Sequence, residues 1–203
     1  MNDRPERSVK PAKPTTLPNV TAPLPPNPHR VGGGYLPHEL PVDFNIRQTK
    51  AYVGGTFDLL HPGHVWLLER VKAHVDLVVV SLNTDEFNVR YKDRAPVMSL
   101  QERMRMVRAL RTVDGIMINE HGEDSKPGVL VATRIGNPGE RHWPVTHVVH
   151  GADWQGDSLM DQLQFTPEWM EEHGIEMLYI DLSEGYSTTS IRQRVIDSRT
   201  EDE

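Results

Sequence analysis

The 203-residue sequence contains no cysteine. Disulfides, thiolate zinc sites and a cysteine nucleophile are therefore excluded. No apolar run approaches the length of about 18 residues that a membrane-spanning helix needs. The charged first ten residues also lack the apolar stretch of a secretory signal. These absences agree with a protein of the reducing cytoplasm, which is the location we expect.

Positive charge is in short supply, with 22 Lys and Arg against 29 Asp and Glu, a formal net charge of −7. An acidic chain is a poor candidate for binding nucleic acid or an anionic membrane. Small anionic substrates remain possible, because a few local cations can hold them. A phosphate site in this chain therefore depends on a few positively charged groups that lie close to one another.

Proline is unevenly distributed, since ten of the 16 prolines lie within residues 1–41. Such a segment cannot bury enough apolar surface to offset the entropy lost on ordering. We expect a disordered tail over 1–34, either a simple extension or a docking arm, and an N-terminal strap over 35–48. The single globular domain then covers 49–198, and 199–203 form an acidic C-terminal tail.

Beyond residue 49, apolar β-branched runs alternate with helical periodicity. Ser99 and Glu102 form a capping box that predicts the start of one helix. This alternation predicts an α/β, Rossmann-like, doubly wound sheet of five parallel strands, with ligands bound beyond the carboxyl ends of the strands. The expected strands are 51–55, 76–82, 115–119, 146–151 and 176–181, and the other expected helices are 63–73 and 187–197.

The segment GGTFDLLHPGH, residues 54–64, directly follows the first expected strand. His61 and His64 lie three residues apart and bracket Pro62-Gly63 at the start of a helix. Because helix N-termini attract anions, the two imidazoles are candidate donors to one phosphate. From these residues alone, a metal site and ordinary surface histidines remain open alternatives.

The complete series of motifs resembles the cytidylyltransferase family of HxGH nucleotidyltransferases, with the closest likeness to the bacterial glycerol-3-phosphate cytidylyltransferases. The resemblance extends over about residues 50–197, nearly the whole expected domain. After GTFDLLHPGH, the motifs that carry it are LLERVK (67–72), NTDEFN (83–88), RALRTVD (108–114), GADWQGD (151–157) and EGYSTTSI (184–191).

The resemblance implies transfer of CMP from CTP to a small phosphate or phosphonate, such as glycerol 3-phosphate, with release of pyrophosphate. It implies that the catalytic residues are His61, His64 and Lys92, the last on a phosphate-reaching loop where Arg90 and Arg94 are alternatives. Asp58 is expected to orient the loop rather than react. Residues implied to line the triphosphate are Gly55, Thr56, Phe57, Ser187, Thr188 and Thr189, although the last three would also serve as a plain helix cap.

Two residues are expected to read the base. In the family, an Arg and an Asp at these motifs lie at the pyrimidine, and they correspond to Arg111 and Asp153. Trp154, next to Asp153, either packs against the base or fills core. Mg²⁺ is the expected cofactor, held chiefly by phosphate oxygens, and no protein metal ligands are expected. Two alternatives remain: an adenylyltransferase that uses ATP and a sugar phosphate, and a nucleotide-binding regulatory module without turnover.

The sequence departs from the family pattern at two places. Leu182 stands where the family carries an Arg, so a positive charge near the phosphates is missing. The segment 121–144 is longer than the family's link and carries several cations. We expect this segment to shape the acceptor pocket and to replace the missing charge, with Arg134, Arg141 and His142 as acceptor-binding candidates and Lys126 nearby. The family also suggests a homodimer.

Overall fold

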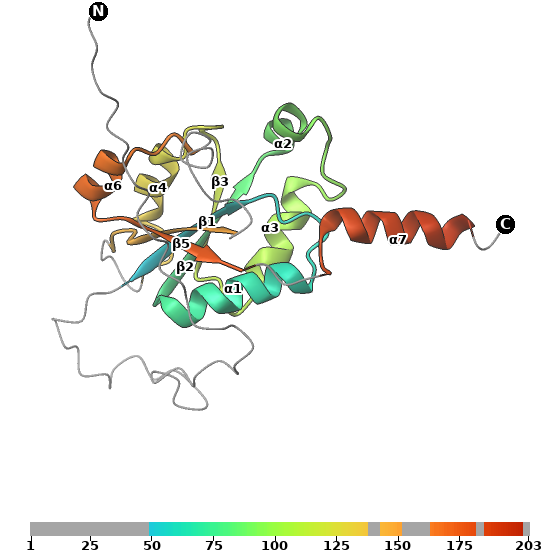
Figure 1. Cartoon of the computed structure of the whole chain (residues 1–203), viewed down its shortest axis with the longest axis horizontal. Coiled ribbons are helices and arrows are strands. Elements are labelled where there is room, and N and C mark those ends of the chain that lie inside the picture. Colours follow the sequence, from blue (N-terminus) through green and yellow to red (C-terminus); the bar gives the residue numbers. More distant parts are fainter. Residues whose placement is uncertain (1–48, 138–142, 152–162, 182–184, 201–203) are drawn as a thin grey trace, which may run out of the picture. The chain divides into compact units, whose positions relative to one another are not determined.

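The computed structural model describes residues 49–137, 143–151, 163–181 and 185–200 (Figure 1). The predicted tail over 1–34 and strap over 35–48 lie outside these residues. Helix α7 continues to Thr200, two residues beyond the predicted end of the domain, and 201–203 lie outside the described part. Within the described segments, no helix is both long and apolar enough to cross a membrane.

Five parallel strands form one sheet in the order β3-β2-β1-β4-β5. The chain therefore winds outward from β1 in one direction and then, from β4, in the other, so that the switch point lies between β1 and β4. The doubly wound fold expected from the sequence is confirmed. The strands are β1 (Lys50–Gly55), β2 (Leu77–Asn83), β3 (Gly115–Asn119), β4 (His147–Gly151) and β5 (Glu176–Ile180).

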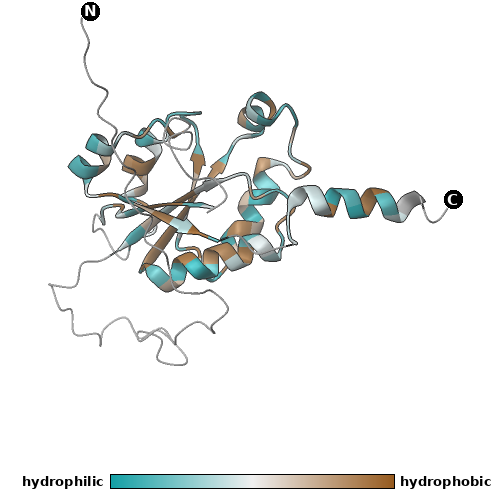
Figure 2. Cartoon of the chain, in the orientation of Figure 1, coloured by the Kyte–Doolittle hydropathy of each residue, from teal (hydrophilic) through white to brown (hydrophobic). Residues whose placement is uncertain are grey.

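Helices cover both faces of the sheet, and the apolar residues lie on the strands and on the inward sides of these helices (Figures 1 and 2). Helices α1 and α3 pack against β2. On the other face, α4 and α6 contribute Val129 and Met170 to a core with Tyr52 and Val79. The helices are α1 (Pro62–His74), α2 (Asp85–Lys92), α3 (Leu100–Arg108), α4 (Lys126–Ala132), α6 (Pro167–His173) and α7 (Thr188–Thr200).

Three helices, α2, α4 and α6, were not predicted from the sequence. Most consequential is α4, because it lies inside the segment 121–144 that we expected to be a long link. Its sequence, KPGVLVA, has a proline and a glycine in the first turn and too few residues to show a helical period. Burial of Val129 and Ala132 against the sheet stabilises α4. This part of the segment 121–144 therefore belongs to the hydrophobic core rather than to a surface link.

Lys50 ties the C-terminus of α4 to the start of β1. The whole residue is buried, and its ammonium donates to the carbonyl oxygens of Ala132 at 3.0 Å and Ile135 at 2.9 Å, and also to the side chain of Asn137. Burial lowers the pKa of this ammonium to about 8, against an opposing effect of the Asp114 charge. The carbonyls at this helix end thereby gain a donor that the helix cannot supply.

We predict that Lys50→Met lowers the free energy of unfolding by about 2 kcal/mol or more, because it leaves buried carbonyl oxygens without a donor. Chemical denaturation at pH 7 measures the change. Lys126→Met, at the other end of α4, is the matched control and should change stability by less than about 0.5 kcal/mol. Equal losses in the two variants would contradict a specific role for Lys50.

Candidate functional site

The loop after β1 leaves the carboxyl edge of the sheet at the switch point and turns back sharply. Phe57 and Leu59 both have positive φ, 52° and 45°, which is costly for residues with a side chain. A Cβ on Gly55 would lie 2.9 Å from the Phe57 ring, so a glycine is needed for the ring to fold back over the chain. Phe57 is buried, and this burial helps to hold the strained turn.

The turn delivers the two motif histidines to the start of α1. His61 immediately precedes the helix, with Pro62 as its first residue. The imidazole rings of His61 and His64 stack with centroids 3.8 Å apart, and the Phe57 ring lies 5.0 Å from that of His64. Both Nδ1 atoms are buried and have no hydrogen-bond partner within the described segments. The structure thus brings the two rings together as adjacent donors.

Both imidazoles are held neutral at pH 7. Burial lowers the pKa of His61. Burial also lowers the pKa of His64 to about 4, assisted by repulsion from His61 when that ring is protonated and by the Lys92 charge, and opposed by Asp58. Two stacked rings in a desolvated site cannot both carry a proton at low cost. Each neutral ring retains one N–H to donate to an anion, and a bound anion would favour protonation.

Asp58 connects the histidine loop to two other segments. Its carboxylate accepts hydrogen bonds from the backbone N–H groups of Val97 and Met98, both at 2.9 Å, and from Nη2 of Arg192 in α7 at 2.8 Å. Burial alone would raise the pKa of Asp58, but these hydrogen bonds and the Arg192 charge lower it. Every part of this arrangement agrees with the orienting role expected from the sequence.

The start of α7 is a helix cap that also contacts the histidine loop. Ser187 Oγ accepts from the backbone N–H of Ser190 at 3.0 Å, and Ser190 Oγ accepts from that of Ser187 at 3.1 Å. Thr188 Oγ1 donates to the Asp58 carbonyl oxygen at 3.1 Å. Thr189 Oγ1 accepts from Arg94 at 3.4 Å. Ser187 and Ser190 therefore cap the start of α7. Thr189 is the hydroxyl of this turn that contacts a cation, Arg94.

The structure separates the three candidate cations. Lys92 is the last residue of α2 rather than part of a loop, and its charge acts on His64. Arg94 reaches α7 through Thr189. Arg90 is directed elsewhere, with its Nε 3.9 Å from the Glu123 carboxylate and its guanidinium over the Phe87 ring. Lys92 and Arg94 thus lie near the histidines and α7, and Arg90 does not.

Two predicted site residues lie at the opposite edge of the sheet. Arg111 is exposed in the turn that precedes β3, at the amino ends of the strands. Arg134 follows α4, and its neighbour Ile135 lies so close to the first residue of β3 that a Cβ on Gly115 would be 2.6 Å from it. Because the histidines lie at the carboxyl edge, neither arginine is brought to them, and we leave both out of the proposed site.

The remaining candidates divide into two groups. Gly55 and Thr56 lie at the end of β1, where the Thr56 hydroxyl contacts Asn88 Oδ1 at 2.5 Å. The other candidates, Arg141, His142, Asp153, Trp154 and the Leu182 position, lie outside the described residues.

Arg103 is an organising residue that the sequence analysis missed. It is fully buried, and its guanidinium donates to the carbonyl oxygens of Thr56 at 2.6 Å and Met98 at 3.2 Å and forms an ion pair with Asp85. A signal was present, because Arg103 shares the buried face of α3 with Val107, four residues on. A charge on an apolar helix face requires partners.

Within the described segments, no group of three His, Asp or Glu side chains is arranged to hold a metal ion. Asp58, the buried carboxylate of the site, is already engaged by three N–H donors. These residues therefore offer no ready-made protein ligand set for Mg²⁺.

We predict that Asp58→Asn lowers the free energy of unfolding by about 2 kcal/mol, because the variant removes the charge facing a partly buried guanidinium and one carboxylate acceptor. Thermal and chemical denaturation measure the effect. Asp93→Asn in the same neighbourhood is the control, since Asp93 ends α2 in the left-handed conformation that Asn also tolerates. A similar stability for both variants would argue against the connecting role of Asp58.

The lowered pKa of His64 predicts a pH dependence of stability. The unfolded chain binds a proton near pH 6.5, whereas folded His64 resists protonation until about pH 4. Since the unfolded state binds more protons between these values, the free energy of unfolding should decrease as the pH falls from 6.5 to 4. His64→Asn should make this decrease shallower in melting curves. The exposed control His121→Asn should leave it unchanged, and a decrease equally steep in His64→Asn would refute the assignment.

The chain is similar to several known proteins. A glycerol-3-phosphate cytidylyltransferase of Bacillus subtilis is 32% identical over 148 residues, which cover 72% of this chain and 96% of that protein. A protein of the same name from Staphylococcus aureus is 33% identical over 143 residues, covering 70% of this chain and 90% of that protein. A bifunctional protein HldE of Hyphomonas neptunium is 31% identical over 165 residues, 76% of this chain but 30% of that protein.

Among solved structures, a lipopolysaccharide core biosynthesis protein from Thermoplasma volcanium superimposes with a TM-score of 0.52 at 20% identity, covering 67% of this chain and 98% of that one, which supports the fold. The cytidylyltransferase-like family matches residues 52–194, a range that contains the switch-point loop, both histidines and the start of α7. With this match and with relatives above 30% identity over most of their length, the chain belongs to the cytidylyltransferase-like family.

Proposed function

We propose that this protein is a nucleotidyltransferase that transfers CMP from CTP to a small phosphate or phosphonate. The observation that carries the proposal is the pair of neutral, stacked imidazoles, His61 and His64, at the switch point between β1 and β4. Relatives named glycerol-3-phosphate cytidylyltransferase, matched over nearly their full length, support CTP as the donor and a small phosphate as the acceptor.

In the proposed reaction, an oxygen of the acceptor phosphate attacks the α-phosphorus of CTP. The new O–P bond forms as the bond from the α-phosphorus to the bridging oxygen breaks, and pyrophosphate leaves with that electron pair. Such a transfer needs alignment and charge neutralisation rather than a covalent enzyme intermediate. His61 and His64 donate to the phosphoryl oxygens, on which charge is spread in the transition state.

Cations from α2 and the loop after it receive the leaving pyrophosphate in this proposal. Lys92 lies within electrostatic reach of His64, and Arg94 meets Thr189 at the first turn of α7. The proposal therefore replaces the charge missing at Leu182 by Arg94, rather than by a cation of the segment 121–144. Backbone N–H groups at the start of α7 add to the same positive region.

Mg²⁺ is also part of the proposal, as an ion that arrives with the triphosphate. The described residues present no carboxylate cluster for it. Phosphate oxygens and water are ligands that Mg²⁺ readily accepts in nucleotide sites.

Replacing His64 tests the catalytic assignment. We predict that His64→Ala reduces kcat by about 10²–10³-fold, the usual consequence of losing one donor to a developing oxyanion. His74→Ala, at the exposed far end of the same helix, is the control and should stay within about two-fold of wild type. A folded His64→Ala protein with nearly normal kcat would remove His64 from the mechanism.

A screen of pyrophosphate release identifies the nucleotide donor and the acceptor. CTP, ATP, UTP and GTP are each offered with glycerol 3-phosphate, other small phosphates, a phosphonate and several sugar phosphates. Release with CTP and a small phosphate or phosphonate is the expected result. Release only with ATP and a sugar phosphate would establish the adenylyltransferase alternative, and nucleotide binding without release would indicate a regulatory module.

A further inference from the structure

Helix α4 presents an apolar surface on its outward side. Four consecutive residues of this helix are apolar, Val129, Leu130, Val131 and Ala132, and Figure 2 shows the helix as largely apolar. Val129 and Ala132 are buried against the sheet, whereas Leu130 and Val131 remain 45% and 43% exposed. A helix that is apolar all round is normally buried on all sides. The exposed pair on α4, Leu130 and Val131, therefore lacks the cover that its composition predicts.

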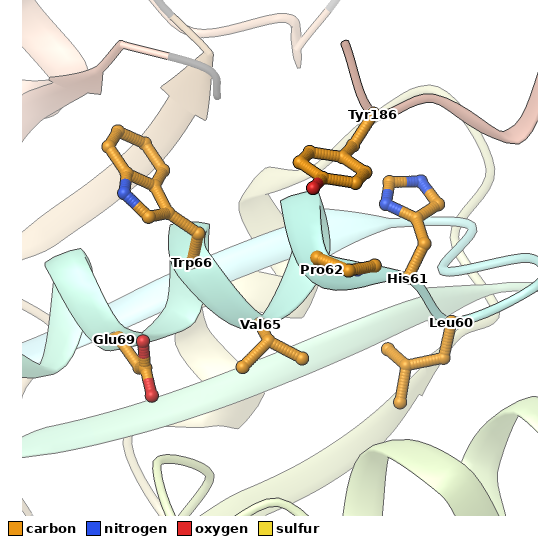
Figure 3. A pocket seen from close by; sticks show the side chains of 7 residues that line it. All are labelled: Leu60, His61, Pro62, Val65, Trp66, Glu69 and Tyr186. Carbon is orange, nitrogen blue, oxygen red and sulfur yellow. The ribbon is translucent and has the colours of Figure 1, made fainter. Parts of the chain in front are cut away.

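The other exposed apolar side chains of the described residues lie in different surroundings. Most of them belong to α2, to the loop after it or to the segment that carries α7, which begins at the carboxyl edge beside the histidines. At that edge, Trp66 and Tyr186 line the hollow that begins at His61 (Figure 3). Met106 is a single exposed side chain on α3, which covers the other face of the sheet. The pair on α4 thus stands apart from the proposed active site.

The chain enters the domain beside the end of α4 that carries this pair. Thr49 is the first described residue, and the next one, Lys50, donates to the carbonyl oxygens of Ala132 and Ile135. Leu130 and Val131 directly precede Ala132 in the same helix. A segment that immediately precedes Thr49 therefore begins close to the exposed pair.

The segment before this entry point has a strictly alternating sequence. Residues 40–47 read LPVDFNIR, in which apolar residues at 40, 42, 44 and 46 alternate with proline and polar residues at 41, 43, 45 and 47. Such alternation predicts an extended segment with one apolar side. At about 3.3 Å per residue, residues 40–46 span about 20 Å, whereas a seven-residue helix such as α4 is about 10 Å long. The Pro-rich residues 1–34 have no comparable alternation.

We propose that residues 40–46, part of the expected strap, dock on the outward side of α4 with their apolar side against Leu130 and Val131. Docking removes apolar surface from water on both partners. Only residues 47–49 separate the segment from the start of β1, so the loop that docking closes is short and its entropic cost is small. A seven-residue helix is too short to be stable by itself, and the docked segment would hold α4 from outside. The inference does not depend on the proposed function.

Cross-linking tests the proposal directly, because the chain contains no cysteine of its own. In the full-length protein, Leu130→Cys is combined in turn with Val42→Cys, Phe44→Cys or Ile46→Cys under mild oxidation. A disulfide requires Cα atoms within about 7 Å of each other, so at least one of these pairs should lose its free thiols within a single chain. Met106→Cys is the matched control, since Met106 is 44% exposed on the other face, and its pairs should keep their thiols.

Thermal unfolding provides a second, independent test. Leu130→Ala should lower the melting temperature by about 2–4 °C, whereas Met106→Ala should lower it by less than about 1 °C. Alanine favours the helix at both positions, so a larger loss at Leu130 reports lost packing. Phe44→Asp should also lower the melting temperature, and Leu130→Ala should add little to that loss because both variants remove one contact. Asn45→Asp, on the polar side of the segment, should leave it unchanged.

Three results would overturn the proposal. The first is equal behaviour of the Leu130 and Met106 variants in both experiments. The second is full additivity of the losses caused by Phe44→Asp and Leu130→Ala. The third is a disulfide that forms only between two chains, visible as a doubled mass on a non-reducing gel, which would show that a second copy covers α4 in place of the chain's own segment.

Discussion

The buried carboxylate of Asp58 is the contact on which the rest of the site depends. A carboxylate removed from water is costly unless donors surround it. Its donors come from the loop after α2, through Val97 and Met98, and from α7, through Arg192. The three segments that carry the histidines, Arg94 and the α7 threonines therefore meet at one ionised group. The site is complete only when all three segments are in place.

A second set of contacts, made by the buried Arg103, holds the same loops as Asp58 does. The guanidinium of Arg103 binds the carbonyl oxygens of Thr56 and Met98, one on each of two loops that Asp58 also joins. Its remaining edge is neutralised by Asp85 at the start of α2. Two buried charges of opposite sign thus fix the same loops from two sides. This double attachment offsets the strain of Phe57 and Leu59, whose positive φ angles no isolated loop would favour.

The electrostatics of the site explain how an acidic protein can handle a triphosphate. Its net charge of −7 opposes anion binding over the surface as a whole. At the carboxyl edge, however, Lys92, Arg94 and two imidazoles gather, and the imidazoles are kept neutral by burial. A neutral imidazole donates a hydrogen bond to a phosphate and does not repel the cations Lys92 and Arg94. An arriving polyanion would raise the pKa of both rings, so the positive charge of the site can increase when substrate binds.

Much of the site could be predicted because its parts are local in sequence. The spacing of His61 and His64 spans one helical turn, and the capping box of Ser99 and Glu102 spans the same distance. The position of other predicted residues depends on the path of the chain rather than on local sequence. Arg111 lies within a motif of the family and Arg134 within the long segment 121–144. However, Arg111 directly precedes β3 and Arg134 lies between α4 and β4, so both are at the amino edge of the sheet.

The sequence by itself determined the five strands and their succession along the chain, the helices α1, α3 and α7, the loop after β1 with its paired histidines and the cap of the last helix. Each of these depends on residues within about one turn or one strand, where backbone geometry leaves few choices. Tertiary structure alone decided that Arg192 would reach Asp58 across 134 residues, that Arg103 would bridge two loops and that Tyr186 would stand beside Trp66. The physical reason is the order of strands in the sheet, which selects the loops that share an edge and so selects the charges that become partners.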